Sequence, residues 1–357
     1  MNFSEPKECQ GLAAITPGGP FQSYTFTRRA CRDNDIVIDI KYAGICHSDI
    51  HQVREEWGKG IFPMVPGHEI GGVVVAKGSN VSEFTVGEHA GVGCMVDSCR
   101  SCKSCKKGSE QYCSNRCVWT YNDKHRHSVE NGNNTYGGYS KFIVVDKDFA
   151  LHIPNNLDLA AATPLMCAGI TVYSPMIQFG LSPQMKFGVV GLGGLGHMAV
   201  KFGVAFGCHT TVISRGVSKR EDALNNLKAN AFLDSKNEDE MKAQNGTFDF
   251  ILCTVSASFD PALYMDLLSV DGKFIVVGVP PEKLSIGLGN LIHKRRTFAG
   301  SLIGGIQETQ DMLDFCGRHN ITCQIEMIDG SKVDESYERA VAGDVKYRFV
   351  IDTATIH

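Results

Sequence analysis

Every second residue of the stretch 35–42 is hydrophobic: Ile36, Ile38, Ile40 and Tyr42. Because successive side chains of a strand point to opposite faces, this alternation predicts a half-buried strand. Residues 68–75, which end in three valines, and residues 141–146 predict two more strands. Glycine and proline punctuate the segments between them, so this part of the chain is predicted to be a compact, turn-rich β domain.

A different rhythm follows Pro154, where short hydrophobic runs are separated by helical segments. The runs predict buried strands at residues 187–190, 210–213, 248–253 and 274–277. Helices are predicted at residues 158–162, 197–206 and 261–268. The capping-box pair Ser218 and Glu221 predicts a further helix that begins at Ser218. Alternating strands and helices are typical of a doubly wound parallel sheet.

The last part of the chain predicts a helix over residues 307–319 and a strand over residues 347–351. The helix carries one core-facing stripe, made of Met312, Phe315, Cys316 and His319. We expect this tail to pack on the β domain. The chain is therefore predicted to be an α/β protein with a β-rich domain (1–156), a domain built on a doubly wound parallel sheet (157–297) and a return segment (298–357) that packs on the first domain.

Length and charge narrow the class of protein. The chain has 357 residues, which suits two domains, and 43% of them are hydrophobic. The formal net charge of −4 provides no basic field that would recruit nucleic acid or an anionic membrane. No apolar run reaches the length of a membrane span, and residues 1–10 lack an apolar signal core. The predicted location is the cytoplasm.

Fourteen cysteines are many for a cytoplasmic protein, in which metal binding is a better account of spaced cysteines than disulfides. Cys46 and His68 offer a thiolate and an imidazole, and Cys167 is predicted to be the third ligand of a catalytic zinc whose fourth position stays open. Eight other cysteines are interpreted as small apolar residues: Cys9, Cys31, Cys94, Cys117, Cys208, Cys253, Cys316 and Cys323.

A second metal site is predicted in a lobe over residues 94–117. Its ligands would be Cys99, Cys102, Cys105 and Cys113, since four thiolates close a tetrahedral structural zinc. Cys94 and Cys117 lie nearby in the sequence and are the alternatives to Cys113 as the fourth ligand. A zinc ribbon that binds nucleic acid through residues 99–113 is the competing interpretation. His125 and His127, in the polar loop 118–138, are interpreted as solvated residues rather than ligands.

A glycine-rich turn directly follows the strand 187–190 and precedes a helix. In that context it is a dinucleotide fingerprint, whose backbone approaches the pyrophosphate. Its residues are Gly191, Gly193, Gly194, Leu195 and Gly196.

The end of the next predicted strand indicates which dinucleotide is bound. An NAD site places an acid there, but this chain has Ser214. The 2′-phosphate of NADP(H) would instead meet hydroxyls and cations at Ser214, Arg215, Ser218 and Lys219.

Five stretches together, residues 46–51, 65–69, 167–171, 193–197 and 308–316, resemble the zinc-dependent alcohol dehydrogenases of the medium-chain superfamily. The chain is most similar to the cinnamyl alcohol dehydrogenase branch, and within it to microbial NADPH-dependent aldehyde reductases. The similarity runs from about Gly11 to Asp352. It implies a GroES-like catalytic domain built from residues 1–156 and 298–357, with a Rossmann nucleotide-binding domain (157–297) inserted between them. It also implies a homodimer joined through the nucleotide domains.

The resemblance also implies roles for individual residues. Glu69 would lie beside the catalytic zinc and Asp49 would orient His68. Ser48 would contact the substrate oxygen and His51 would pass a proton to solvent. Trp119 would line the substrate pocket. Trp57 is predicted to line the same pocket, because it lies in a segment of the sequence that flanks the zinc ligands. The remaining cofactor contacts would come from Thr171, Val277, Ser301, Ile303 and Arg348.

These features predict an alcohol dehydrogenase, working as an aldehyde reductase, that binds two zinc ions per chain and NADP(H). Its substrates would be aromatic or medium-chain aldehydes and alcohols. A polyol dehydrogenase is the main alternative, against which the aromatic residues Trp57, Trp119 and Tyr121 argue. A zinc-ribbon protein and an inactive relative that kept the scaffold are further alternatives.

Overall fold

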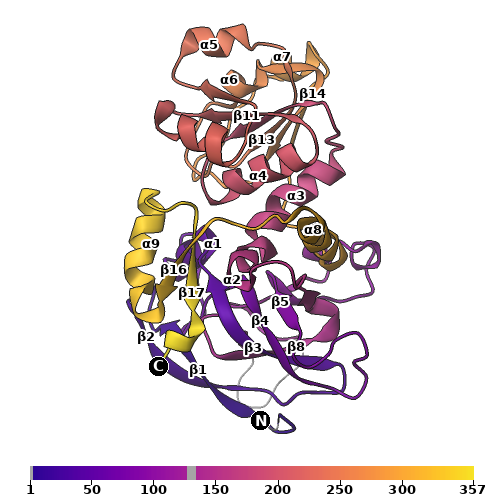
Figure 1. Cartoon of the computed structure of the whole chain (residues 1–357), viewed down its shortest axis with the longest axis vertical. Coiled ribbons are helices and arrows are strands. Elements are labelled where there is room, and N and C mark those ends of the chain that lie inside the picture. Colours follow the sequence, from indigo (N-terminus) through magenta and orange to yellow (C-terminus); the bar gives the residue numbers. More distant parts are fainter. Residues whose placement is uncertain (1–2, 127–133) are drawn as a thin grey trace. The chain divides into compact units, whose positions relative to one another are not determined.

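The computed structural model describes residues 3–126 and 134–357, and it contains two compact units (Figure 1). The first unit comprises both ends of the chain, Met1–Cys167 and Gly304–His357, and the second is Ala168–Ile303. The sequence predicts the two domain boundaries after residues 156 and 297, whereas the structure has them after Cys167 and Ile303. Residues 157–167 lie with the first unit because their helical turns pack on its central strands.

The first unit is organised around a seven-stranded sheet with β3 (Asp35–Gly44) at its centre. The order is β16-β17-β3-β4-β5-β9, and β8 also pairs with β3. The other strands of the sheet are β4 (Ile70–Lys77), β5 (His89–Val92), β8 (Phe142–Asp146), β9 (Leu151–His152), β16 (Ile325–Asp329) and β17 (Arg348–Asp352). β17 runs antiparallel to β3 with Val350 opposite Gly44, so the tail completes the sheet.

Two smaller strand pairs flank this sheet: β1 (Lys7–Ala14) with β2 (Phe21–Arg28), and β6 (Met95–Asp97) with β7 (Val118–Trp119). The α-helices of this unit are α1 (His47–Val53), α2 (Leu159–Ala162), α8 (Ile306–His319) and α9 (Val333–Ala342). Its short helical turns are η1 (Cys105–Lys107), η2 (Glu110–Tyr112), η3 (Lys147–Phe149), η4 (Thr163–Met166), η7 (Gly330–Lys332) and η8 (Thr353–Thr355).

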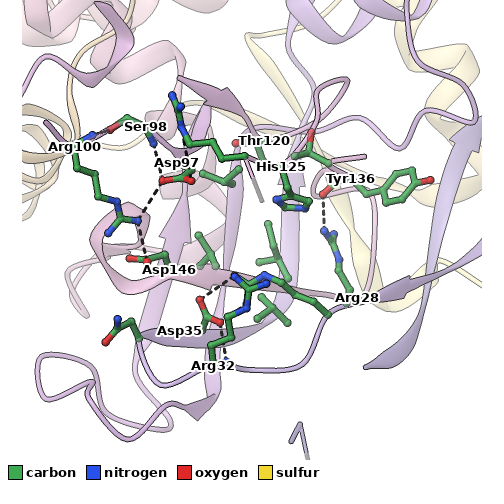
Figure 2. A pocket seen from close by; sticks show the side chains of 18 of the residues that line it. Arg28, Arg32, Asp35, Asp97, Ser98, Arg100, Thr120, His125, Tyr136 and Asp146 are labelled. Atoms are coloured by element: carbon green, nitrogen blue, oxygen red, sulfur yellow. Dashed lines mark hydrogen bonds and ion pairs between the residues drawn. The ribbon is translucent and has the colours of Figure 1, made fainter. Parts of the chain in front are cut away.

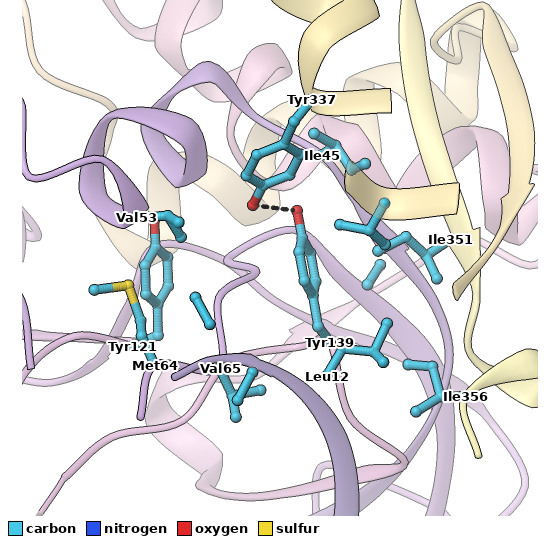
Figure 3. Packing of buried hydrophobic residues seen from close by; sticks show 14 of the residues in the cluster. Leu12, Ile45, Val53, Met64, Val65, Tyr121, Tyr139, Tyr337, Ile351 and Ile356 are labelled. Atoms are coloured by element: carbon cyan, nitrogen blue, oxygen red, sulfur yellow. Dashed lines mark hydrogen bonds between the residues drawn. The ribbon is translucent and has the colours of Figure 1, made fainter. Parts of the chain in front are cut away.

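A buried cluster beneath α1 and α9 contains a hydrogen bond between two tyrosines (Figure 3). The Tyr337 hydroxyl donates to the Tyr139 hydroxyl at 3.3 Å. Both rings are buried among aliphatic side chains such as Leu12 and Ile351. Buried hydroxyls need partners, so this pair holds α9 in one position against the segment that contains Tyr139.

The second unit has a six-stranded parallel sheet with the order β12-β11-β10-β13-β14-β15. Its strands are β10 (Lys186–Val190), β11 (His209–Ser214), β12 (Ala231–Asp234), β13 (Phe248–Cys253), β14 (Leu268–Val276) and β15 (Thr297–Gly300). Its helices are α3 (Ala168–Gln178), α4 (Gly194–Ala205), α5 (Glu238–Ala243), α6 (Pro261–Met265) and α7 (Leu288–Ile292), with the shorter turns η5 (Val217–Lys219) and η6 (Asp222–Asn226). Numbered from β10, this order is 3-2-1-4-5-6, so the doubly wound sheet is confirmed.

Several predicted boundaries are wrong. The strand predicted from residue 68 begins at Ile70, because His68 and Glu69 turn into a buried site. The helix predicted over 261–268 ends at Met265, since Leu268 pairs with Phe248 as the start of β14. On α8, His319 is exposed, and the buried stripe is Thr309, Met312, Leu313 and Cys316.

The capping box predicted at Ser218 is also wrong. Gly216 occupies the N-cap of the short turn η5, and Ser218 lies inside that turn. The Gly216 N–H donates to Asp234 Oδ1 at 2.7 Å, so the neighbouring strand satisfies the start of the turn. A carboxylate from β12 therefore replaces the expected cap.

Within the described residues, no single helix has the length and apolar composition needed to cross a membrane. One bent pair of helical segments, Leu159–Met166 and Ala168–Gln178, has that length and composition only when the two are taken together.

Candidate metal centres and nucleotide site

The first candidate metal centre brings together Cys46, His68, Glu69 and Cys167, all of them buried. One ligand atom from each lies within 4.8 Å of the others. The sulfurs of Cys46 and Cys167 are 3.9 Å apart, although 121 residues separate them in sequence. Two sulfurs bound to one tetrahedral zinc at 2.3 Å would be separated by roughly 3.8 Å, so the pair fits that ion.

Electrostatics in this cluster favour a thiolate. A hydrogen bond with Cys167 lowers the pKa of the Cys46 thiol well below its ordinary value, against the effect of burial and with the help of His68. Burial alone would lower the pKa of His68, but Cys94 and Asp49 raise it well above its ordinary value. Deprotonated sulfur is the form that binds zinc, so the lowered pKa of Cys46 suits a metal. Hydrogen bonds with Cys46 and Cys94 raise the pKa of the Cys167 thiol, so a bound zinc would displace protons from Cys167 and His68.

Asp49 holds the His68 ring. Its Oδ1 lies 3.2 Å from His68 Nδ1, which leaves Nε2 as the other nitrogen available to a metal. Asp49 is fully buried, and it also accepts hydrogen bonds from the Cys46 N–H at 2.8 Å and from the Tyr139 hydroxyl at 3.3 Å. A chain of contacts therefore runs from Tyr337 through Tyr139 and Asp49 to His68.

Glu69 lies against Arg348 rather than standing alone. Arg348 Nη2 is 2.5 Å from Glu69 Oε1 and 2.8 Å from the Ile45 carbonyl. Burial raises the pKa of Glu69 to about 8, although Arg348 opposes the shift. Glu69 Oε2 has no hydrogen-bond partner within the described residues, and such an orphaned buried oxygen fits a nearby cation. Arg348, predicted to contact the cofactor, is thus placed next to this carboxylate.

Ser48 and His51 share the short helix α1 with Asp49. The Ser48 hydroxyl oxygen is 3.6 Å from Cys46 Sγ, and one turn later His51 stacks on Trp57, with ring centroids 4.6 Å apart. His51 Nδ1 is paired with the Glu56 carboxylate, a partner that sequence analysis missed. This contact fixes which ring nitrogen faces away from Glu56.

The aromatic residue that packs on the metal ligands is Tyr121. Its ring stacks on His68 with centroids 5.8 Å apart and an interplanar angle of 10°. Trp57 is 47% exposed, and Trp119 lies in β7 opposite Met95. The substrate roles of Trp57 and Trp119 stay predictions.

Cys94 and His125 require corrections. Cys94, interpreted as a small apolar residue, has its thiol pKa lowered by a hydrogen bond with Cys167, so it belongs to the polar surroundings of this centre. Only the sheet brings it there, and its local sequence carries no signal of it. His125, interpreted as solvated, is half-buried in a cavity, and burial lowers its pKa to about 4. His127 lies outside the described residues.

The second candidate metal centre consists of Cys99, Cys102, Cys105 and Cys113, whose sulfurs all lie within 4.8 Å of one another. Cys99 and Cys105 are 3.9 Å apart, and the N–H groups of Cys99 and Cys102 point at sulfurs of the set. Backbone N–H groups of Ser101 and Cys102 lower the pKa of Cys99 to about 5. Four such donors leave no open position, which suits a structural zinc.

Arg100 and Glu110 fasten this lobe to the rest of the first unit. Arg100 pairs with Asp97 at 3.3 Å, Asp146 at 2.9 Å and Asp148 at 2.6 Å. Glu110 Oε2 accepts from the Ile306 N–H at 3.0 Å, at the start of α8. A carboxylate at a helix N-terminus is stabilising, so the lobe also supports the return segment.

The nucleotide fingerprint in the second unit has the backbone that close approach requires. Gly191 has φ +91°, and a Cβ at Gly196 would lie 2.1 Å from the Gly191 carbonyl. A Cβ at Gly193 would meet nothing within 4 Å, so that side of the turn is open at the N-terminus of α4. Lys219 Nζ donates to the Leu192 carbonyl at 2.7 Å across this turn.

The end of β11 places the predicted NADP(H) residues together. Arg215, Ser218 and Lys219 are exposed beside Ser214. Asp234, which no local sequence pattern connects with this site, lies directly opposite Ser214 on β12. Its Oδ1 accepts the N–H groups of Gly216 and Lys236, which lower the pKa of this carboxyl. The carboxylate therefore supports the turn.

The residues predicted near the nicotinamide lie in the same unit. Val277 and Ser301 directly follow the carboxyl ends of the neighbouring strands β14 and β15, and Ile303 is buried with φ +35°. Thr171 is buried in α3. Ligands of doubly wound sheets bind at the carboxyl ends of the strands, so the positions of Val277 and Ser301 are consistent with that role.

Comparison with known proteins places these sites in a family. Residues 32–155 match the alcohol dehydrogenase GroES-like domain, and residues 194–318 match the zinc-binding dehydrogenase family. A probable formaldehyde dehydrogenase of Bacillus subtilis is 49% identical over 94% of this chain and 95% of its own length. This chain belongs to the zinc-dependent medium-chain alcohol dehydrogenases.

Other members of the family are similarly close. The NADP-dependent alcohol dehydrogenase C 1 of Mycolicibacterium smegmatis is 48% identical (96% of this chain, 97% of the relative), and a probable mannitol dehydrogenase of Medicago sativa is 46% identical (98% and 96%). A solved cinnamyl alcohol dehydrogenase from Sorghum bicolor superposes with a TM-score of 0.94 at 44% identity, over 98% of this chain and 99% of that one. The chain thus lies in the cinnamyl alcohol dehydrogenase branch of the zinc-dependent alcohol dehydrogenases.

Proposed function

We propose that this protein is an NADP(H)-dependent zinc alcohol dehydrogenase that works as a reductase of aromatic or medium-chain aldehydes. The observation that carries the proposal is the buried set of Cys46, His68 and Cys167, with Glu69 paired to Arg348. Three protein ligands leave one position for a substrate oxygen, as a catalytic zinc site requires.

The side chains around this centre have separate tasks. Cys46, His68 and Cys167 would hold the zinc. When bound, zinc supplies Lewis acidity toward a carbonyl oxygen and NADPH supplies the hydride. Ser48 would hydrogen-bond the substrate oxygen, a role that its position 3.6 Å from Cys46 Sγ supports. His51, held by Glu56 through Nδ1, can keep a proton at Nε2 and exchange it with solvent.

The cofactor preference rests on the end of β11. Ser214 leaves room for a 2′-phosphate, and Arg215 and Lys219 offer charge-assisted hydrogen bonds to it. The relative from M. smegmatis, named NADP-dependent, supports the same choice.

The substrate class rests on Trp57, Trp119 and Tyr121. Large aromatic faces favour apolar substrates, because burying an apolar group against them removes its surface from water. A polyol dehydrogenase is the second candidate, favoured by the relative that is named a probable mannitol dehydrogenase.

Steady-state kinetics separate the two candidates. Purified protein is mixed with NADPH or NADH and with benzaldehyde, hexanal, acetaldehyde or fructose, and cofactor absorbance is followed. We expect NADPH and benzaldehyde or hexanal to give the highest kcat/KM. A higher kcat/KM with fructose would show that the protein is a polyol dehydrogenase. No oxidation of NADPH with any of these substrates would contradict both proposed functions.

We further propose a cytoplasmic homodimer. All fourteen cysteines lie among the described residues and none of them forms a disulfide, which supports a reducing compartment. In the second unit, β15 is an edge strand, and the apolar side chains of Leu288 and Ile292 on α7 are 70% and 72% exposed. An unpaired edge and exposed apolar side chains suit an interface with a second subunit. Light scattering should give twice the chain mass, and Leu288→Asp with Ile292→Asp should halve it; an unchanged mass would remove α7 from the interface.

A further inference from the structure

A cavity of about 680 Å³ in the first unit lies outside both metal centres, although Cys99 contributes to its wall (Figure 2). The turn after β2, the start of the zinc lobe, β8 and the segment around His125 line it. Figure 2 shows Arg28 and Tyr136 on one side, Arg100 with Asp97 and Asp146 on the other, and His125 between them. Small-molecule sites have volumes of this order.

Five arginines and four aspartates line the cavity, but the charges do not cancel locally. Arg29 is paired with Asp35, and Arg100 with Asp97 and Asp146. Asp33, the fourth aspartate, accepts a hydrogen bond from the Ser79 hydroxyl at 2.7 Å. The guanidinium groups of Arg28 and Arg32 have no carboxylate within 4.0 Å among the described residues, and that of Arg126 has only a distant one, because Asp97 Oδ2 lies 3.9 Å from its Nε.

Arg28 is a buried cation whose hydrogen-bond acceptors are all neutral. It is 8% exposed, and its guanidinium donates to the carbonyls of Tyr136 (2.7 Å), Gly137 (3.0 Å) and Phe142 (3.1 Å) and to the Ser140 hydroxyl (3.0 Å). Its charge therefore acts on the cavity without a neighbouring carboxylate to cancel it.

Arg126 and Arg32 complete the excess of positive charge. The Arg126 Nε is buried without a hydrogen-bond partner among residues 3–126 and 134–357, and its ion pair with Asp97 Oδ2 is long, at 3.9 Å. Its Nη2 donates to the Asn115 carbonyl at 2.9 Å and to Cys113 Sγ at 3.8 Å, which leaves Nε and Nη1 for a ligand. Arg32 is exposed, and no carboxylate of the described chain lies within 4.0 Å of its guanidinium. A guanidinium without a carboxylate partner, such as that of Arg32, is suited to bind an oxyanion in two-point fashion.

The titration of His125 is consistent with a positive potential here. Burial, and then the charges of Arg29, Arg28 and Arg32, lower the pKa of His125 to about 4, while Asp123 opposes them. The ring is therefore neutral near pH 7 and adds no charge of its own. Part of the wall is apolar and includes Val96, Ile143 and Val145.

We propose that this cavity binds a small phosphate-bearing molecule, with the phosphate at Arg32 and Arg126, the buried charge of Arg28 behind it, and any organic group against the apolar wall. The volume exceeds what inorganic phosphate alone would fill, so a phosphate monoester suits it better. The proposal is independent of the reaction at the zinc centre.

Calorimetric titration of the zinc-loaded protein tests the proposal. Saturating NADP+ is present throughout, so that the nucleotide site is closed, and ionic strength is held constant with chloride. The probes are AMP and inorganic phosphate. We expect both to bind, AMP at least tenfold more tightly; equal affinities would instead identify free phosphate as the occupant of the same site.

Variants locate the binding. Arg32→Glu combined with Arg126→Glu should weaken AMP binding at least tenfold, and each single alanine variant should weaken it less. Arg318→Glu, at an exposed arginine of α8, is the matched control and should bind as the wild type does. All variants should keep the kcat for aldehyde reduction, which shows that they are folded. Absence of binding by both probes, or unchanged binding in the double variant, would overturn the proposal.

Discussion

Position 44 accepts no side chain, because a Cβ on Gly44 would lie 2.1 Å from Glu69 Oε2. Arg348 holds the other oxygen of Glu69 at 2.5 Å, so the carboxylate cannot move aside easily. The missing side chain of Gly44, at the end of β3, therefore leaves the space that this buried carboxylate occupies beside the metal ligands. This glycine is needed for space, since its φ is not among the positive values of the chain.

His51 provides the first prediction at this scale. His51→Gln removes a proton-exchanging nitrogen and should slow alcohol oxidation by roughly 10²–10⁴-fold at low pH, with recovery as pH rises and hydroxide takes over the proton. Glu56→Gln keeps a hydrogen-bond partner without the charge and should have a smaller effect. A pH–rate profile of His51→Gln that parallels the wild type would remove His51 from the mechanism.

Ser214 provides the second prediction at the scale of single residues. Ser214→Asp places a carboxylate where the 2′-phosphate would lie, so the ratio of kcat/KM for NADPH over NADH should fall by at least tenfold. Lys219→Ala should raise the KM for NADPH, by roughly 1.5–3 kcal/mol in binding free energy, and leave kcat nearly unchanged. Asp234→Asn is the control, because Asp234 is engaged by backbone N–H groups. An unchanged cofactor ratio in Ser214→Asp would contradict the assignment.

His125 provides a prediction of pH dependence. Its pKa of about 4 in the folded protein lies below its ordinary value near 6.5, so the unfolded chain binds the extra proton more readily. The free energy of unfolding should therefore decrease as pH falls from about 6.5 to 4, by at most roughly 3 kcal/mol from this residue. His125→Asn should flatten this part of the curve in urea denaturation; an identical slope would contradict it.

At the scale of elements, α9 reaches the metal ligands through a line of polar contacts. Tyr337 donates to Tyr139, Tyr139 donates to Asp49, and Asp49 lies against His68. The line crosses from the C-terminal return segment to α1 within the first unit. The helix thus has a task beyond covering the sheet, because it supports the group that orients a ligand.

Tyr139→Phe tests this line. Removing the hydroxyl leaves the Tyr337 hydroxyl without its acceptor and should cost roughly 1–3 kcal/mol of stability. Zinc affinity at the Cys46 centre should fall by roughly 10–100-fold, measured by competition with a chelator. Tyr112→Phe, at a half-exposed tyrosine, is the control. Unchanged chelator resistance in Tyr139→Phe would show that Asp49 needs no support from α9.

At the scale of the whole molecule, the two metal centres should be separable. We expect two zinc ions per chain and one in either Cys102→Ala or Cys167→Ala. Cys102→Ala should destabilise the protein by about 4 kcal/mol or more, because an all-thiolate site contributes folding energy. Cys167→Ala should abolish turnover and keep NADPH binding, since the glycine turn lies in Ala168–Ile303. Elemental analysis measures the zinc content, thermal unfolding the stability and fluorescence titration the binding of NADPH. One zinc per active wild-type chain would contradict the prediction of two metal centres.

Local patterns were sufficient for much of this molecule. The alternation in β3, the strand–glycine turn–helix of β10 and α4, and the close spacing of Cys99, Cys102 and Cys105 each involve residues that are neighbours in the chain. Periodicity and short spacing report on such features, because backbone geometry alone brings these residues together. The boundaries of α6 and η5 were missed where contacts from another strand overrode the local signal.

The sequence by itself thus determined the fold class, the group of four cysteines at residues 99–113 and the nucleotide fingerprint, since these depend on residue types at short spacings. The set of Cys46, His68 and Cys167 was predicted from ligand chemistry and family resemblance, but tertiary structure brings its two cysteines together across 121 residues. Tertiary structure alone decided which distant groups meet. The pairing of β17 with β3 accompanies the contact of Arg348 with Glu69, and the pairing of β11 with β12 sets Asp234 opposite Ser214. Neither the position of Cys94 near Cys167 nor the arginine-lined cavity has a local pattern. Each depends on sheet register and side-chain direction, which a linear sequence does not display.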